Sequence, residues 1–350
     1  MDGMKISRRG LLFAAAASAF PMPRAVTGRR FYAGSYTSSG GPGMLLGTAD
    51  PATGALTVQV KSAAVADPSW LAPGPKALYA ISESNGTVSA VDPSTLAVRN
   101  TVSTGSGPAH VAVQPGSALL FTSLYDGGAT VTHPIAADGT VKARTDSRKQ
   151  GSGSHAHQVV VDPTGRYLLA MDLGRDSVFV YTLNANRLTL SRQVQFPTGT
   201  GPRHLAFHPG GTHAYLAGEN GNNVTVCSWQ NGVLTPGQSL PASDAAVTNY
   251  PGEIVTSPDG RFVYVSNRGA NTVGVFTTSA DGSTLTPVAA PACGGDWPRN
   301  LALTPDAGWL YVANQNSGTI TWLPVSPTTG IPGAVAGSLP VPGAAHILFA

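Results

Sequence analysis

The fold is decided by the stretch Pro202–Trp229, PRHLAFHPGGTHAYLAGENGNNVTVCSW. It predicts three short strands, because runs of apolar, β-branched and aromatic residues are separated there by Gly, Pro and Asn. The same frame recurs in Pro251–Phe276 (PGEIVTSPDGRFVYVSNRGANTVGVF) and in Pro298–Leu323 (PRNLALTPDAGWLYVANQNSGTITWL). A frame that repeats at a nearly constant interval is typical of a repeat architecture.

Weaker copies extend the repeat along almost the whole chain. The copies begin, at intervals of 40 to 49 residues, at Pro68, Pro108, Ala156, Pro202, Pro251, Pro298 and Ala344. This interval is about the length of a four-stranded propeller blade. Each copy also contains a weaker fourth strand, such as the one expected at Leu285–Val288. The sequence therefore predicts an all-β, seven-bladed β-propeller with four antiparallel strands in each blade.

The last copy is incomplete, because Gly343–Ala350 (GAAHILFA) provides only one strand. Near the start of the chain, three strands are expected at Arg30–Thr37, Met44–Thr48 and Leu56–Val60. They correspond to the second, third and fourth strands of a blade that lacks its first strand. We therefore expect the C-terminal strand to complete the N-terminal blade. Closing the ring in this way removes exposed sheet edges.

The first residues predict a targeting segment. Ser7–Phe13 (SRRGLLF), followed by the small residues of Ala14–Ala19, resembles a twin-arginine export signal. The apolar run is too short to span a membrane. We therefore divide the chain into an export signal with its leader, residues 1–29, and a propeller domain, residues 30–350. The protein is expected in the periplasm or outside the cell.

The charge of the propeller domain is nearly balanced. The chain has a net charge of +3, but residues 1–30 contain six basic residues against one acidic residue, so the remainder carries −2. This balance gives no support for nucleic-acid binding, which needs a basic surface. Because charged residues make up only 11% of the chain, any place where they gather is informative. We expect the closed ring to be a monomer.

Two columns of polar residues are predicted to meet at one mouth of the central channel. In a propeller, the loop that enters the first strand of each blade and the loop between its second and third strands lie on the same face. The first column contains His155, His157, Arg203, His204, Glu253 and Arg299, with His110, Asn300 and His346. The second contains Glu83, Tyr125, Asp172, Glu219, Asn267, Arg268, Asn314 and Gln315.

The combination of opposite charges in these columns favours a binding site. Desolvating His155, Arg203, Glu219 and Arg268 in one funnel costs free energy, which function would explain. His110 and His346 are interpreted instead as contacts between blades. A metal ion is not predicted, because His155 and His157 share a strand face without an obvious third ligand.

No other cofactor is predicted either, and the chain lacks the G-x-S-x-G motif of a nucleophile elbow. A disulfide between Cys227 and Cys293, the only two cysteines, stays open. The simpler interpretation of Cys227 is a small buried apolar residue.

At these residues the chain resembles the seven-bladed propeller lactonases, known for 6-phosphogluconolactonase and for the fungal carboxy-cis,cis-muconate cyclase. The resemblance rests on Tyr32–Thr37 (YAGSYT), the His155–His157 pair, Gly201–Pro209 (GPRHLAFHP), Ser257–Gly269 (SPDGRFVYVSNRG) and Pro298–Gln315. It implies His155, Arg203, Glu219 and Arg268 as catalytic residues. The substrate-binding residues are then expected among His157, His204, Glu253, Asn267, Arg299, Asn314, Gln315, Asp172, Tyr125 and Glu83.

The leading functional hypothesis is a lactonase acting on a sugar-type lactone. Water would attack the carbonyl, Arg203 assisted by Arg268 would hold the oxyanion, and Glu219 or His155 would act as general base. Three arginines, Arg203, Arg268 and Arg299, suggest a small anionic or carbonyl-rich ligand. An exported enzyme would meet a lactone other than the cytosolic phosphorylated one.

Two alternatives stay open: a cycloisomerase that closes an unsaturated dicarboxylate into a lactone, and a non-catalytic propeller that binds a ligand or a protein.

Overall fold

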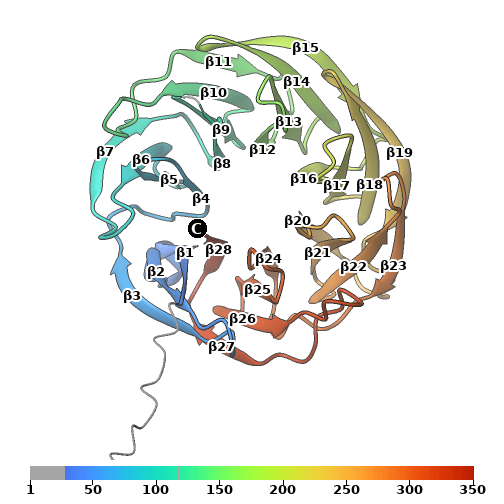
Figure 1. The fold of residues 1–350 in the computed structure, drawn as a ribbon. Coiled ribbons are helices and arrows are strands. Elements are labelled where there is room, and N and C mark those ends of the chain that lie inside the picture. The colour runs from blue at the N-terminus through green and yellow to red at the C-terminus, as the bar shows by residue number, and fades with distance from the viewer. Residues whose placement is uncertain (1–27, 117) are drawn as a thin grey trace, which may run out of the picture.

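The computed structural model describes residues 28–116 and 118–350, so residues 1–27 of the predicted export signal and leader lie outside the described residues. Seven sheets, each of four antiparallel strands, surround one axis (Figure 1). The described part of the chain contains one short 3-10 helix, η1 (Thr37–Ser39), and no helix long and apolar enough to cross a membrane. The predicted all-β, seven-bladed architecture is confirmed.

Each blade runs from an inner strand beside the axis to an outer strand at the rim (Figure 1). Blade 1 combines β28 (Ala344–Phe349), β1 (Arg29–Ser35), β2 (Met44–Ala49) and β3 (Leu56–Ser62). Blade 2 consists of β4 (Leu71–Pro73), β5 (Leu78–Ser82), β6 (Thr87–Val91) and β7 (Val98–Ser103). Blade 3 consists of β8 (Pro108–Val113), β9 (Leu119–Leu124), β10 (Ala129–Pro134) and β11 (Asp146–Lys149). Blade 4 consists of β12 (Ala156–Val161), β13 (Tyr167–Asp172), β14 (Ser177–Asn184) and β15 (Arg187–Gln195). Blade 5 consists of β16 (Pro202–Phe207), β17 (His213–Gly218), β18 (Asn223–Gln230) and β19 (Val233–Pro241). Blade 6 consists of β20 (Tyr250–Thr256), β21 (Phe262–Arg268), β22 (Thr272–Thr278) and β23 (Leu285–Ala289). Blade 7 consists of β24 (Pro298–Leu303), β25 (Trp309–Asn314), β26 (Thr319–Pro324) and β27 (Gly337–Pro340).

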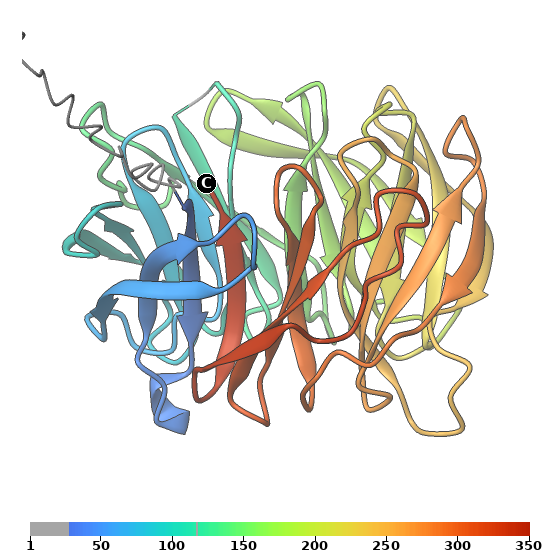
Figure 2. The same cartoon turned by 60° about the horizontal axis from the view of Figure 1, so that its bottom comes forward.

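The ring closes where the two ends of the chain meet. β28 pairs antiparallel with β1, so that Ala33 lies opposite Ile347 and Phe31 opposite Phe349. Figure 2 shows the red C-terminal strand beside the blue first strand. The prediction that the last strand completes the first blade is confirmed.

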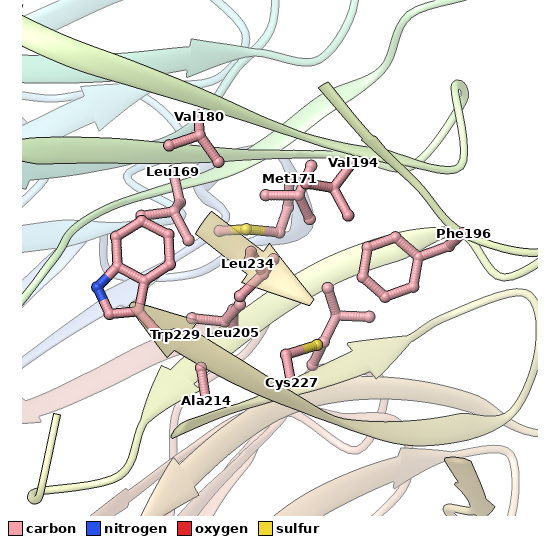
Figure 3. Close-up of a cluster of buried hydrophobic side chains, with 12 residues drawn as sticks. Leu169, Met171, Val180, Val194, Phe196, Leu205, Ala214, Cys227, Trp229 and Leu234 are labelled. Carbon is pink, nitrogen blue, oxygen red and sulfur yellow. The ribbon is translucent and has the colours of Figure 1, made fainter. Parts of the chain in front are cut away.

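Apolar layers between neighbouring blades form the core. Between blades 4 and 5, Met171 and Phe196 pack with Cys227 and Trp229 (Figure 3). Both faces of a middle strand are covered by neighbouring blades, which explains why those strands are apolar without interruption. Each large side chain buried in this way contributes about 1.5–3 kcal/mol to the stability of the fold.

Cys227 and Cys293 are both free and buried, so Cys227 acts as a small apolar core residue.

Buried tyrosines on the second strands of five blades bind the next blade. Each hydroxyl donates a hydrogen bond of 2.7–3.0 Å to a carbonyl in an outer turn: Tyr32 to Pro93, Tyr79 to Gly139, Tyr215 to Gly282, Tyr264 to Gly330, and Tyr311 to Gly54. The four glycines have φ of +69° to +91°, which a side chain would make unfavourable. We call these contacts the tyrosine clips. At the equivalent position, blade 3 has Phe121 and blade 4 has Leu169, which carry no hydroxyl.

Replacing a clip should weaken the ring measurably. Tyr264→Phe keeps the ring of the side chain but leaves the Gly330 carbonyl without its hydroxyl donor, so the free energy of unfolding is expected to fall by about 1–3 kcal/mol. Urea denaturation measures the change. Tyr167→Phe is the matched control, because the Tyr167 hydroxyl makes no hydrogen bond to a described residue. Equal stability of both variants would contradict a stabilising role for the clip.

Candidate active site

A β-bulge recurs at the start of the inner strands β8, β12, β16, β20 and β24, and in three of them it directs a long polar side chain to the channel mouth. The pairing register with the second strand shifts across His157 in β12, across Arg203 in β16 and across Arg299 in β24. A bulged residue leaves the regular ladder, which changes the direction of its side chain. The repeated Pro-x-x or Ala-x-x entrance of each copy therefore presents these three residues at one end of the channel.

The Glu219 carboxylate joins two arginines from different blades. Its Oε2 lies 3.0 Å from Nε of Arg203 and 2.7 Å from Nη2 of Arg268. Arg203 also donates from Nη1 to the Gly252 carbonyl at 2.7 Å, and Arg268 donates from Nε to the Tyr250 carbonyl at 3.0 Å. The exposed fraction of the side chain is 2% for Arg203 and 5% for Arg268, against 20% for Glu219. We call this group the Arg203–Glu219–Arg268 cluster.

The charges of the cluster stabilise one another. Burial alone would raise the pKa of Glu219, but Arg268 and Arg203 outweigh it, so the pKa lies below its ordinary value. Burial, and then the neighbouring charge of Arg268, lower the pKa of Arg203 to about 9, so the guanidinium remains protonated at neutral pH. The cluster therefore presents two cations and one anion.

A second charged group faces the first one across the mouth. The Tyr36 hydroxyl donates to Oε2 of Glu83 at 2.9 Å, and the Arg299 guanidinium lies 5.5 Å from the centre of the Tyr36 ring. Arg299 also lies 3.9 Å from Glu83. The charge of Arg299 also helps to lower the pKa of Glu219, so this second group interacts electrostatically with the cluster. Three arginines thus oppose two carboxylates, and the mouth has a positive net charge.

Aromatic rings flank the charged groups. The Arg268 guanidinium lies 5.5 Å from the centre of the Trp297 ring, a cation–π contact. His155 stacks on Tyr125 with the ring centres 4.5 Å apart. Trp297 has φ of +62°, where an ordinary side chain is strained and function often accounts for the strain. Sequence reasoning missed Tyr36 and Trp297, although a tryptophan directly before a repeat start, where Gly107 and Gly201 stand in other copies, was a usable signal.

Three of the residues predicted for substrate binding are engaged inside the protein. Asp172 accepts hydrogen bonds from the Ser154 hydroxyl at 2.5 Å and from the His155 backbone at 2.9 Å, so it holds the loop that carries His155. The Asn267 amide donates to the Ala242 carbonyl, and the Asn314 amide donates to the Thr321 hydroxyl. All three side chains are fully buried and lie outside the site proposed below.

Asp172, Asn267 and Asn314 are each followed by a residue whose side chain points the other way, because successive side chains of a strand alternate between its two faces. Glu83, Tyr125, Glu219 and Arg268 are in this position and contribute to the mouth. Gln315 shares the position but lines a separate cavity with Ser39 and Pro342.

The channel is filled in its middle. The Trp70 ring lies between His110 and His346, with ring centres 4.2 and 4.0 Å away. His346 also accepts a hydrogen bond from the Leu71 backbone, which agrees with its interpretation as a contact between blades. Below this layer, a cavity of about 370 Å³ opens on the opposite face and reaches Trp70, Glu253 and His346. The charged mouth and this cavity are therefore on different sides of the layer.

The arrangement at the mouth suits a ligand that carries or develops negative charge. Fixed guanidinium groups in a partly dry pocket stabilise an oxyanion, because they need no reorganisation when the charge forms. Among residues 28–116 and 118–350, no group of three or more His, Cys, Asp or Glu side chains is placed to hold a metal ion.

Removing the carboxylate of the cluster should destabilise the fold. Glu219→Gln leaves Arg203 buried beside Arg268 without its anion, and breaking a buried ion pair in this way costs about 3–5 kcal/mol. The loss is expected in full above the ordinary pKa of 4.5 and should shrink as the pH falls through the lower folded-state pKa of Glu219. Denaturant titrations of both proteins at several pH values measure this difference.

The exposed pair of Arg261 and Asp259, at 2.7 Å, provides the control. Arg261→Gln breaks a surface ion pair and should change stability by at most about 1 kcal/mol. A loss for Glu219→Gln that is equally small, or that does not depend on pH, would show that the cluster contributes no coupled charge stabilisation.

Comparison with known proteins agrees with this geometry. The family model described as "Lactonase, 7-bladed beta-propeller" matches residues 30–349. A 6-phosphogluconolactonase of Bacillus subtilis strain 168 is 29% identical over 287 residues, which cover 76% of this chain and 82% of that protein. A 6-phosphogluconolactonase of Pectobacterium carotovorum is 35% identical over 186 residues, covering 51% of this chain and 55% of that protein.

Solved structures with the same ring include a protein from Lactobacillus plantarum, with 32% identity and a TM-score of 0.87 over 93% of this chain and 100% of that chain. They also include the periplasmic gluconolactonase of Pseudomonas aeruginosa, with 27% identity and a TM-score of 0.86 over 92% of this chain and 98% of that chain. Because the family model matches nearly every described residue, the chain belongs to the seven-bladed β-propeller lactonase family.

Proposed function

We propose that this protein hydrolyses a sugar-type lactone at the Arg203–Glu219–Arg268 cluster. The observation that carries the proposal is a pair of buried guanidinium groups that share one carboxylate at the channel mouth. Membership of the lactonase family and similarity to proteins named 6-phosphogluconolactonase or gluconolactonase support it.

Lactone hydrolysis places negative charge where the arginines lie. Water adds to the ring carbonyl, and the carbonyl oxygen becomes an oxyanion in the tetrahedral intermediate. Arg203, assisted by Arg268, stabilises this oxygen until the ring C–O bond breaks and the ring oxygen takes up a proton. One such donor contributes about 10²–10³-fold to the rate.

Glu219, one of the two bases anticipated from sequence, is a weak base. Arg268 and Arg203 hold its pKa below the ordinary value, and a carboxylate stabilised in this way accepts a proton poorly. Its role in the proposal is to orient the two arginines. His155 stands at the mouth beside Tyr125, with Nδ1 3.3 Å from the Tyr125 carbonyl.

The substrate is an aldonolactone with several hydroxyl groups, phosphorylated or not. Glu83, Tyr36 and Arg299 offer acceptors and donors for hydroxyl groups on the side of the mouth opposite the cluster. Arg299 would also pair with a phosphate, if the lactone carries one.

Proton release tests the reaction, because each hydrolysed lactone yields one carboxylic acid. The wild-type protein is expected to release acid from at least one member of a panel that contains δ-gluconolactone and 6-phosphogluconolactone. Arg203→Lys keeps the charge but loses the planar fork, and Arg203→Ala removes both, so kcat should fall by about 10²–10³-fold in each.

Arg261→Gln, an arginine variant on the opposite face, is the control and should retain full activity. An active Arg203→Ala variant would exclude the cluster as the oxyanion site. Absence of acid release from every lactone would favour a cycloisomerase or a binding propeller. Lactone formation from an unsaturated dicarboxylate, followed by ultraviolet absorbance, separates these two.

We also propose that the protein is exported through its twin-arginine segment. The motif around Arg8 and Arg9 supports this proposal, and one structural relative is named as periplasmic. Replacing both arginines by lysine should retain the protein inside the cell, as measured by fractionation and immunoblotting. Unchanged export of the double variant would contradict the proposal.

A further inference from the structure

A chain of hydrogen bonds runs through the channel wall across four blades. Nδ1 of His157 lies 3.1 Å from Nε2 of His204, and Nδ1 of His204 lies 2.9 Å from Oε1 of Glu253. The second carboxylate oxygen of Glu253 accepts a 2.6 Å hydrogen bond from the Asn300 amide. None of the reaction steps described above uses this chain.

The remaining partners give the chain a direction. Asn300 Oδ1 accepts from the Ile347 backbone at 3.0 Å, which fixes the NH₂ group of Asn300 toward Glu253. The Ile254 backbone donates to the other Glu253 oxygen at 3.0 Å. An ionised Glu253 accepts from all three partners, and His204 then carries its proton on Nδ1. Its Nε2 then accepts from His157, so His157 is protonated on Nδ1 and has a lone pair on Nε2.

That lone pair is open to the channel. Nε2 of His157 makes no hydrogen bond to any residue in the described ranges. This unpaired atom is not fully buried, so a small molecule such as water can reach it. The exposed fraction of His157 is 6%, so the opening is small. His157 does not line the cavity on the opposite face, whereas Glu253 does. The accessible end of the chain is therefore on the side of the charged mouth.

His157 also lies near the aromatic pair at the mouth, Tyr125 and His155. Its ring centre is 6.0 Å from that of Tyr125, whose other contact is the stacked His155. Both His157 and Arg203 are the bulged residues of adjacent inner strands, and the charge of Arg203 acts on the His157 ring. A water molecule between the two would face a proton acceptor and an oxyanion donor.

We propose that His157, rather than His155 or Glu219, is the general base of the lactonase, and that His204 and Glu253 are positioning residues that relay its proton. The inference rests on the proposed function. As the water oxygen bonds to the carbonyl carbon, its proton moves to Nε2 of His157. The Nδ1 proton of His157 moves to Nε2 of His204, and the Nδ1 proton of His204 moves to Glu253. When the ring C–O bond breaks, the three transfers reverse and the ring oxygen gains the proton.

The relay avoids a charge that the site disfavours. Burial, and then the charge of Arg203, lower the pKa of His157 and of His204 well below the ordinary value, so an imidazolium there is costly. Burial raises the pKa of Glu253, against the opposing effect of Arg203. Moving the proton on to Glu253 leaves both imidazoles neutral and removes a buried negative charge. His155, whose Nδ1 faces a carbonyl, has no comparable acceptor behind it.

Kinetics separate the relay from a structural role. His157→Gln, His204→Gln and Glu253→Gln are expected to lower kcat by about 10²-fold or more with KM changed only a few-fold. His346→Gln, which changes a buried channel histidine outside the chain, should retain kcat within a few-fold. Added imidazole should restore part of the activity of His157→Ala and none of that of Arg203→Ala. A His157→Gln variant with wild-type kcat, while Arg203→Ala is inactive, would overturn the relay and leave the proposed function intact.

A second measurement does not depend on activity. Long-range ¹H–¹⁵N correlation spectra of histidine-labelled protein, assigned with the same variants, report which ring nitrogen carries the proton. We expect Nδ1 to be protonated in both His157 and His204. Protonation of His204 on Nε2 would reverse the direction of the chain and overturn the proposal. If the wild-type protein hydrolysed no lactone, the proposed function would fail, and the spectra would still decide the direction of the chain.

Discussion

The inner edge of each blade faces the axis with backbone groups that no further strand can pair, and the structure depends on how they are satisfied. Buried N–H groups need acceptors. Side chains on the preceding inner strand provide them: Gln158 accepts from Leu205 at 2.7 Å, Asn300 from Ile347 at 3.0 Å and His346 from Leu71 at 3.3 Å. A propeller of this size therefore requires polar residues along its channel, whatever its function.

This requirement explains how a reactive site fits into a sequence with so few charges. The residues that link blades already place imidazole, amide and carboxylate groups around the axis, with their partners fixed. The recurring bulge at the entrance of the inner strands then needs to add only three further side chains, His157, Arg203 and Arg299. Buried guanidinium groups are tolerated there because Glu219 and backbone carbonyls compensate their desolvation.

The repeat allowed most of the fold to be predicted, including the strand shared by both ends of the chain. The period of the repeat determines which residues lie at the same level along the channel axis. It therefore predicted that Arg203, Glu219 and Arg268 lie close together. The period does not fix which side of a strand end faces the mouth. Asp172 and Asn267 turn inward, whereas Glu219 and Arg268, one position further along their strands, face the mouth. A one-residue offset of this kind depends on the local turn, which the sequence pattern does not resolve.

The tyrosine clips run around the ring with a gap on both sides of blade 4. Blade 3 has Phe121 and blade 4 has Leu169 at the clip position, so blade 4 neither receives such a bond from blade 3 nor makes one to blade 5. Blade 4 also carries His155 and His157. Other contacts hold blade 4 instead: the Ser123 hydroxyl of blade 3 donates to the His157 carbonyl at 2.7 Å, and an apolar cluster that includes Met171 and Trp229 joins blade 4 to blade 5. The blade that carries the two histidines is therefore fastened close to the axis, at the backbone of His157 itself, rather than at its outer turn.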